Sequence, residues 1–221
     1  MNDNCHALGA TYFGDKQYAV KYADAITQSY HPVKHITTGE GGAILTNKEE
    51  IAIKCRELRD HGMSHQKKYH HTDLGYNYRM TDILAALGII QMNRIDSILD
   101  EKDQLAVNYK KSFQDTNWLK TPFVPEYVTR HSWYNYTISL DSTYRDDLIE
   151  YLDKNKIETR LSFPPVHIQP VYKKLFNYNE DDIPNAYKSY LEFIDIPIWK
   201  GMKTEDQDLI IETIIAYRGV I

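Results

Sequence analysis

The segment from residue 81 to about residue 113 most limits what this chain can fold into. Apolar side chains recur along it at helical spacing: Ile83, Leu87, Ile90 and Ile95. Small residues lie between them near the start: Ala85, Ala86 and Gly88. The sequence therefore predicts one long helix, beginning at Thr81, that another element can approach closely.

Shorter elements are predicted on both sides of this helix. Upstream, a strand is expected over 43–46 and a helix from Asn47, its N-cap, to about Asp60. Downstream, Pro122 and Pro125 mark a boundary. Beyond them strands and helices are expected to alternate, over 134–140, 145–155, 158–163, 187–193, 195–198 and 204–217. This order indicates a larger domain over 1–114 and a small α+β domain over 115–221.

Composition excludes several classes of function. The 221 residues are 42% hydrophobic and 26% charged, with a formal net charge of −5 and dispersed basic residues. That distribution disfavours nucleic-acid binding, which needs a surface that neutralises phosphates. No apolar run approaches the ~18 residues of a membrane span, and the start does not resemble a signal peptide. A cytoplasmic protein that binds no membrane is the expectation.

Neither cysteines nor histidines predict a metal site. Cys5 and Cys55 are the only cysteines and lack the C-x-x-C spacing of zinc sites, which also disfavours a disulfide framework. Four histidines gather in a polar loop: His61, His65, His70 and His71. No pattern of carboxylates accompanies them, so a solvated loop is expected and no metal is predicted.

The segment 29–42 carries the strongest chemical signal. Lys34 lies between Pro32 and the glycine-rich run at 39–42, with Ser29 five residues before it. Glycine lets backbone approach a bound group, and a lysine held in such a place can lose a proton and attack a carbonyl. The lysine precedes the glycines, which excludes the phosphate-loop template. On spacing alone, an ordinary surface lysine beside a turn is the commoner interpretation.

Two further segments join this one in chain order. Residues 3–10 read Asp-Asn-Cys-His-Ala-Leu-Gly-Ala, and residues 74–83 include Gly-Tyr-Asn-Tyr-Arg-Met. Taken singly, Asp3 is a solvated carboxylate, His6 a core histidine and Asn77 part of a helix-opening turn. Together, the three segments closely resemble the DegT/DnrJ/EryC1/StrS family of sugar aminotransferases. The resemblance runs along the whole chain.

The resemblance implies an α/β fold, the pyridoxal 5'-phosphate (PLP)-dependent transferase fold type I, like aspartate aminotransferase. It implies that Lys34 forms the Schiff base with PLP and that Ser29 binds the cofactor phosphate. Asp3 would pair with the pyridinium nitrogen, and His6 would lie against the ring. Asn77 would reach the phosphate held by the partner subunit of a homodimer with a shared active site. Arg79 is equally well explained as a structural ion-pair residue.

The C-terminal part also resembles the family, at 157–160, 163–167 and 196–198. Arg160 and His167 are therefore candidates for the wall of the substrate pocket, because arginine suits diphosphate recognition by charge and geometry. His131 and Trp133 are weaker candidates of the same kind.

The resemblance implies transamination of a nucleotide-linked 4-keto-6-deoxy sugar for amino-sugar and surface-glycan synthesis. The amino donor is an amino acid, commonly glutamate in the family. The segment 29–34 most resembles members acting on UDP-linked precursors of pseudaminic-acid type, and 61–95 equally resembles GDP-perosamine-type members. Both nucleotides remain open.

Family members carry an additional N-terminal region with early strands of the large-domain sheet. We therefore expect that the large domain of this chain is partial and that the chain is inactive alone. One option is that a separate N-terminal fragment is its partner. A non-catalytic regulatory or binding relative, or a decayed fragment of the same fold, is the alternative.

Overall fold

The computed structural model describes residues 1–217, so the last four residues of the predicted small domain lie outside the described range. The chain forms two compact units. The first comprises Met1–Asp100 with Val124–Tyr134, and the second comprises Glu101–Phe123 with Asn135 onward. This division differs from the predicted boundary after residue 114, because the chain passes between units within a helix and later returns to the first unit.

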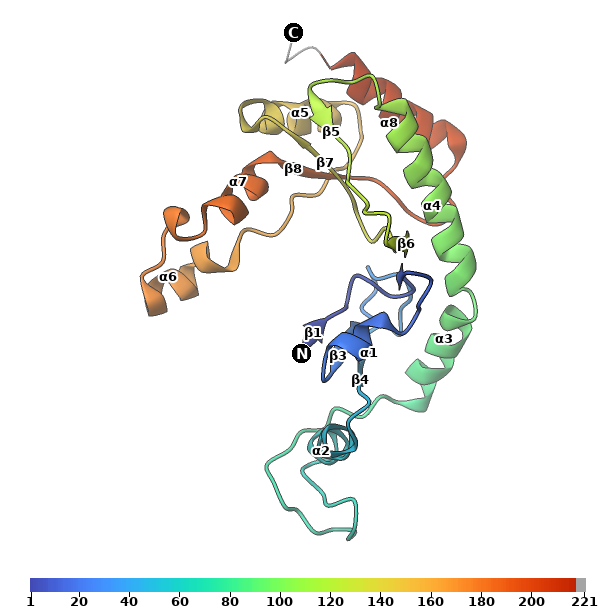
Figure 1. Ribbon diagram of the computed structural model, residues 1–221, viewed down its shortest axis with the longest axis vertical. Helices are drawn as coiled ribbons and strands as arrows, with labels where there is room; N and C mark the ends of the chain where they lie inside the picture. Colours follow the sequence, from blue (N-terminus) through green and yellow to red (C-terminus); the bar gives the residue numbers. More distant parts are fainter. Residues whose placement is uncertain (218–221) are drawn as a thin grey trace. The chain divides into compact units, whose positions relative to one another are not determined.

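The first unit contains a three-stranded sheet in the order β1-β3-β4 (Figure 1). Its strands are β1 (Asn2–Asp3), β3 (Ile26–Ser29) and β4 (Gly42–Leu45). β1 runs parallel to β3, with Asp3 opposite Thr27, and β4 runs antiparallel to β3. The predicted strand over 43–46 is therefore confirmed within one residue.

The first unit contains further strands and helices. They are β2 (Thr11–Tyr12), α1 (Tyr18–Tyr22), α2 (Glu49–Arg59), α3 (Asp82–Met92) and β6 (Val128–Arg130). β2 pairs antiparallel with β6, which ties the returning segment to the start of the chain. Asn47 does not cap α2, as the sequence predicted. Its side-chain amide donates to the Val20 carbonyl, and the Thr46 hydroxyl accepts from the Lys48 amide instead.

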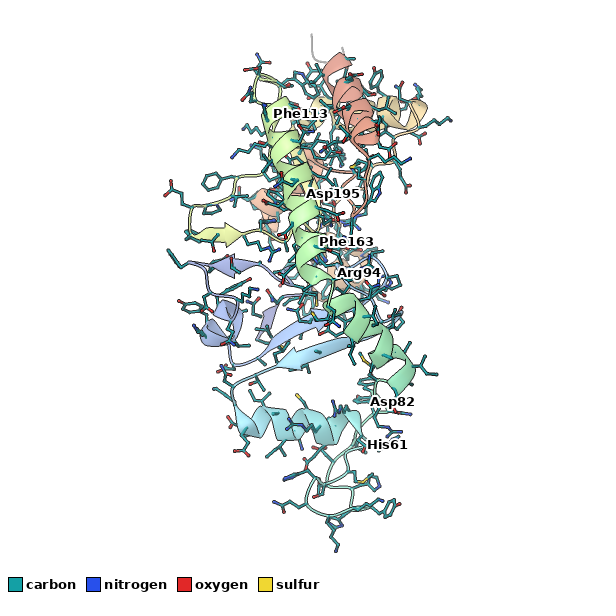
Figure 2. The ribbon with its side chains drawn as sticks, turned by 90° about the vertical axis from the view of Figure 1, so that its right-hand side faces the viewer. His61, Asp82, Arg94, Phe113, Phe163 and Asp195 are labelled. Carbon is teal, nitrogen blue, oxygen red and sulfur yellow. The ribbon has the colours of Figure 1, made fainter. Side chains whose placement is uncertain are left out.

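The predicted long helix is two helices, α3 and α4 (Ile95–Ser112). Thr81 caps α3 as predicted, its hydroxyl accepting from the Leu84 amide. At the junction, labelled by Arg94 in Figure 2, the Arg94 amide bonds to the Gln91 carbonyl three residues back. This tighter turn follows Asn93, a residue type whose side chain competes with helical hydrogen bonding. The interruption is therefore local, and both halves keep the expected helical pattern.

The second unit is an α+β structure built on an antiparallel sheet in the order β5-β7-β8. The strands are β5 (Leu119–Lys120), β7 (Tyr136–Leu140) and β8 (Phe193–Ile196). The helices are α5 (Ser142–Lys154), α6 (Pro170–Phe176), α7 (Pro184–Glu192) and α8 (Thr204–Ala216), with short 3-10 turns at Val166–Ile168 and Glu180–Asp182. The sheet and helices share a core of fully buried side chains: Ile138, Leu148, Leu152, Ile194 and Ile214.

The predicted strand over 158–163 is wrong. Only Arg160 pairs there, exchanging backbone hydrogen bonds of 3.0 and 2.9 Å with Asp195 of β8. Pro164 and Pro165 follow at once, and proline has no amide hydrogen to extend a ladder. None of the helices within residues 1–217 combines the length and apolarity needed to cross a bilayer.

One face of α4 supplies a buried stripe, and it contains a lysine. The buried positions recur at helical spacing: Ile98, Leu99, Lys102, Ala106 and Tyr109. Burial lowers the pKa of Lys102 to about 8. The unfolded chain keeps this proton until about pH 10.4. Folding therefore releases the proton between those values, so this residue's contribution to stability rises as pH increases through that window.

We expect the free energy of unfolding of the wild type, measured relative to Lys102→Met, to rise as the pH increases from about 8 to 10. The reason is that the wild-type lysine becomes neutral in the folded protein within this window. Urea denaturation at pH 7, 9 and 10 measures it. Lys110→Met, at an exposed position of the same helix, is the matched control. Equal effects of the two substitutions at every pH would contradict the prediction.

Candidate functional site

The end of β1 presents an ionised carboxylate. Asp3 lies beside Thr27 of the parallel strand, and its Oδ1 accepts hydrogen bonds from the Cys5 amide at 3.0 Å and the Thr27 hydroxyl at 3.5 Å. Hydrogen bonds from the Cys5 thiol and amide lower the pKa of Asp3, and the charge of His6 adds to the effect. The carboxylate is exposed, so it is both negative and accessible.

A tight turn after Asp3 sets the place of His6. The Ala7 amide bonds to the Asn4 carbonyl at 3.1 Å, and the Ala10 amide to the Ala7 carbonyl at 3.0 Å. Gly9 has φ +80°, and a Cβ there would lie 2.2 Å from Cδ1 of Leu99, a fully buried residue of α4. Glycine thus lets the turn lie directly on α4, which fixes the backbone that carries His6.

The loop between β3 and β4 carries Lys34 at its tip. Its two ends are joined by a hydrogen bond of 2.9 Å from the Tyr30 amide to the Gly41 carbonyl. Within it, the Lys34 amide bonds to the His31 carbonyl at 2.9 Å. The loop also packs on α3, where a Cβ on Gly88 would lie 2.8 Å from the methyl group of buried Thr38. The predicted close approach to the small residues of this helix is thereby confirmed at Gly88.

Lys34 and His6 meet. The Lys34 Nζ lies 2.6 Å from the His6 Nε2, within hydrogen-bond distance. Ser29 ends β3 at the base of the same loop, and its hydroxyl accepts from the His31 amide at 3.4 Å. Since β1 and β3 are neighbours, Asp3 belongs to this same end of the unit. The structure thus brings together two segments that are separate in sequence, one with Asp3 and His6 and the other with Ser29 and Lys34.

A third segment completes this cluster, and sequence reasoning missed its central residue. The Tyr134 ring stacks on the His6 ring with centroids 3.8 Å apart, and the Lys34 Nζ lies 4.5 Å from the Tyr134 centroid. Trp133 and His131, the weaker candidates, contact each other with ring centroids 4.2 Å apart. The run of aromatic residues before β7 was the available signal.

Asn77 lies elsewhere in the first unit. Its backbone forms an antiparallel bridge with Asp60 at the end of α2, and its side chain is exposed. Within residues 1–217, the Asn77 side chain forms no hydrogen bond with Lys34. The neighbouring Arg79 forms an ion pair with Asp60, which favours the structural interpretation of this arginine.

The two candidate pocket residues belong to the second unit. The Arg160 guanidinium donates to the Asn135 side-chain oxygen at 2.7 Å and lies 3.6 Å from the Asp195 carboxylate. Asp195 is buried and accepts from Asn135 and from the Thr137 hydroxyl, both at 2.6 Å. Arg160 is therefore held at a defined position, with its side chain half exposed.

His167 is buried in the 3-10 turn at Val166–Ile168. Its Nε2 has no hydrogen-bond partner among the described residues. In the polar loop of the first unit, the His71 Nδ1 lies 3.0 Å from the His61 carbonyl. Residues 1–217 contain no cluster of three or more histidine, cysteine or acidic side chains arranged for a metal ion.

Comparison with a family model covers almost the whole chain. The model of the DegT/DnrJ/EryC1/StrS aminotransferase family matches residues 1–215. This chain belongs to that family. The matched range includes the first compact unit, most of the second and all of the candidate residues.

Curated relatives show how much of a family member this chain represents. It is 36% identical to GDP-perosamine synthase of Caulobacter vibrioides over 96% of this chain and 56% of the relative. It is 33% identical to UDP-4-amino-4,6-dideoxy-N-acetyl-beta-L-altrosamine transaminase of Campylobacter jejuni, over 98% of this chain and 57% of the relative. The chain thus spans a little over half the length of these proteins.

A solved structure confirms the fold. PseC of Helicobacter pylori, an aminotransferase involved in the biosynthesis of pseudoaminic acid, matches with a TM-score of 0.87 and 26% identity. The match covers 96% of this chain and 57% of that one. The predicted fold, a partial fold type I aminotransferase, is therefore confirmed.

We expect Gly9→Ala to destabilise the protein more than Gly14→Ala. Both glycines have positive φ, +80° and +76°, so each alanine costs about 1–2 kcal/mol of backbone strain. Only at position 9 does the new Cβ collide with buried Leu99, adding roughly 1–3 kcal/mol of overpacking. Thermal unfolding of both variants measures the difference. Equal destabilisation would show that the turn does not depend on contact with α4.

Proposed function

We propose that this chain is the cofactor-lysine and C-terminal portion of a PLP-dependent aminotransferase that acts on a nucleotide-linked keto sugar. The observation that carries the proposal is the 2.6 Å contact between Lys34 and His6 at the strand end where Asp3 lies. Family membership supports the cofactor, since members of this family are PLP-dependent.

The side chains at this strand end fit PLP chemically. The Asp3 carboxylate, kept ionised by its hydrogen bonds, suits a protonated pyridine nitrogen. The Ser29 hydroxyl suits a phosphate oxygen, and the Lys34 amine suits the aldehyde. When bound, PLP supplies an electron sink that stabilises negative charge on the reacting carbon. Asn77 of a second subunit would add a further phosphate contact.

Lys34 has two roles in this proposal, and both use Nζ. The amine would hold the cofactor in the site through a covalent bond. When not so bonded, the same nitrogen would take and return a proton at the reacting carbon of the substrate. The His6 Nε2 lies within hydrogen-bond distance of Nζ and would help to orient it. Glutamate, as the common donor in the family, is the proposed source of nitrogen.

The sugar nucleotide would be recognised by groups of the second unit. Arg160, held by Asn135 and Asp195, presents a half-exposed guanidinium that suits a diphosphate. His167 is the accompanying candidate from the 3-10 turn. Named relatives handle GDP-linked and UDP-linked sugars at similar identity, 36% and 33%. The proposal is therefore a nucleotide-linked 4-keto-6-deoxy sugar, with either nucleotide.

A homodimer is the proposed assembly. Helix α3 has no buried residue, and its large apolar side chains are exposed: Ile83, Leu87, Ile89 and Ile90. Tyr76 and Tyr78, which precede it, are exposed as well and stack on each other. A contiguous apolar face of this kind typically marks a protein interface.

The covalent cofactor bond provides the test. After incubation with PLP and reduction with borohydride, peptide mapping should find the cofactor on Lys34. Lys34→Arg should abolish that adduct, because a guanidinium does not form it, and leave the thermal unfolding temperature within a few degrees. Lys48→Arg, at an exposed lysine of the same unit, should keep the adduct at the wild-type level.

The mapped position also separates the alternatives. Folded protein that takes up no cofactor at Lys34 would contradict the proposal and favour a non-catalytic binding or regulatory relative. An adduct spread over exposed lysines, unchanged in Lys34→Arg, would do the same. Adding a relative's N-terminal portion in trans to a separate, unreduced sample loaded with PLP then measures whether the chain transaminates.

A further inference from the structure

Tyr134 contacts both partners of the Lys34–His6 pair. Its ring lies nearly parallel to the His6 imidazole, with an interplanar angle of 18° and centroids 3.8 Å apart. The same ring lies 4.5 Å from the Lys34 Nζ, a distance at which an ammonium is attracted to an aromatic face. The three groups thus form a closed triangle, since Nζ also lies 2.6 Å from the imidazole Nε2.

The backbone before Tyr134 is fastened to both of the other segments. The Ser132 hydroxyl donates to the His6 carbonyl at 2.6 Å. The Ser132 carbonyl lies 2.8 Å from the Nε2 of His35, the residue that follows Lys34. Ser132 and His35 are both buried, so these hydrogen bonds form away from water. Ser132 therefore fastens the segment before Tyr134 both to the turn that bears His6 and to the loop that bears Lys34.

The conformation of Trp133 shows that this placement is enforced. Its φ is +48°, in the left-handed region that bulky residues rarely adopt, and its side chain is buried. The Trp133 amide donates to the His131 Nδ1 at 3.0 Å, which supports the turn. Strained backbone of this kind persists only where the surroundings determine it. The direction of Tyr134 is thus set by the fold.

We propose that Tyr134 is a positioning residue that holds the Lys34 amine beside His6, in one place, whenever the lysine is not bonded to the cofactor. A lysine side chain is flexible, and confining it before reaction removes an entropic cost from the bond-forming step. As the ammonium becomes a nucleophile, one proton leaves Nζ for water, and Nζ stays 2.6 Å from the His6 Nε2. This inference rests on the proposed function only for the identity of the aldehyde, PLP, with which Nζ would react.

Other titratable groups near Lys34 come from each packed segment. The β1 turn contributes Asp3, Cys5 and His6, of which Asp3 interacts with both of the others. The lysine loop contributes His31 and His35, and the third segment contributes His131 and Tyr134. Tyr134 is the member whose removal takes away an attraction for the ammonium without removing a charge. Its substitution therefore separates positioning from general electrostatics.

The test compares Tyr134→Leu, which removes the ring, with Tyr134→Phe, which keeps it. Tyr22→Leu is the matched control, because Tyr22 is an exposed tyrosine of α1 in the same unit. The rate of Lys34 acetylation by trace acetic anhydride is measured at one fixed pH by peptide mass spectrometry, with exposed Lys67 as internal reference. This first readout needs no cofactor. The rate of borohydride-trapped PLP attachment to Lys34 is the second.

Without the ring, acetylation of Lys34 relative to Lys67 should become about threefold faster, since the cation–π contact that holds the ammonium is lost. PLP attachment should nevertheless slow several-fold, because the amine is no longer confined. Tyr134→Phe and Tyr22→Leu should match the wild type in both readouts. A purely structural Tyr134 would lower the folded fraction without changing the relative acetylation rate of the folded protein.

The proposal is overturned if Tyr134→Leu and Tyr134→Phe share the wild-type relative acetylation rate and attachment rate. Circular dichroism establishes folding first, and Tyr134→Met replaces the leucine variant if that one is unfolded. Failure of the proposed function has a different signature. The wild type would then take up no PLP at Lys34, while the relative acetylation rates would still differ between the leucine and phenylalanine variants.

Discussion

The parallel pairing of β1 with β3 is the constraint on which the candidate site depends. It is very short, with Asn2 opposite Ile26 and Asp3 opposite Thr27. Yet it places a carboxylate and the start of the lysine loop at the same end of neighbouring strands. The carboxyl ends of adjacent parallel strands are where α/β proteins gather ligand-binding groups. The hydrogen bonds and packing contacts of the turn at 4–10 and of the lysine loop keep this arrangement in place.

Packing against helices gives this strand end its rigidity. The turn bearing His6 lies on Leu99 of α4, and the lysine loop lies on α3 through Thr38 and Gly88. In each case a glycine lacks the side chain that would otherwise keep the two segments apart. The reactive groups thus sit on loops, and the loops are immobilised by contacts with regular structure. Such support is what keeps functional groups within the small tolerances that chemistry needs.

The sequence predicted much of this because the informative signals were local. Lys34, Asp3 and His6 belong to short motifs in a fixed order, and periodicity revealed α3, α4 and β7. What failed depended on distant partners. Arg160 pairs with β8 across a long connection, and prolines end that pairing at once, so a strand pattern became a single bridge. Tyr134 meets His6 only after the chain has travelled through α3 and α4, which no local pattern encodes.

The first unit is discontinuous in the chain, because residues 124–134 return to it after the chain has entered the second unit. Strand β6 and Tyr134, whose ring contacts Lys34, therefore follow a stretch of sequence that belongs to the other unit. A single cut in the chain therefore cannot separate the lysine-bearing unit intact from the other unit.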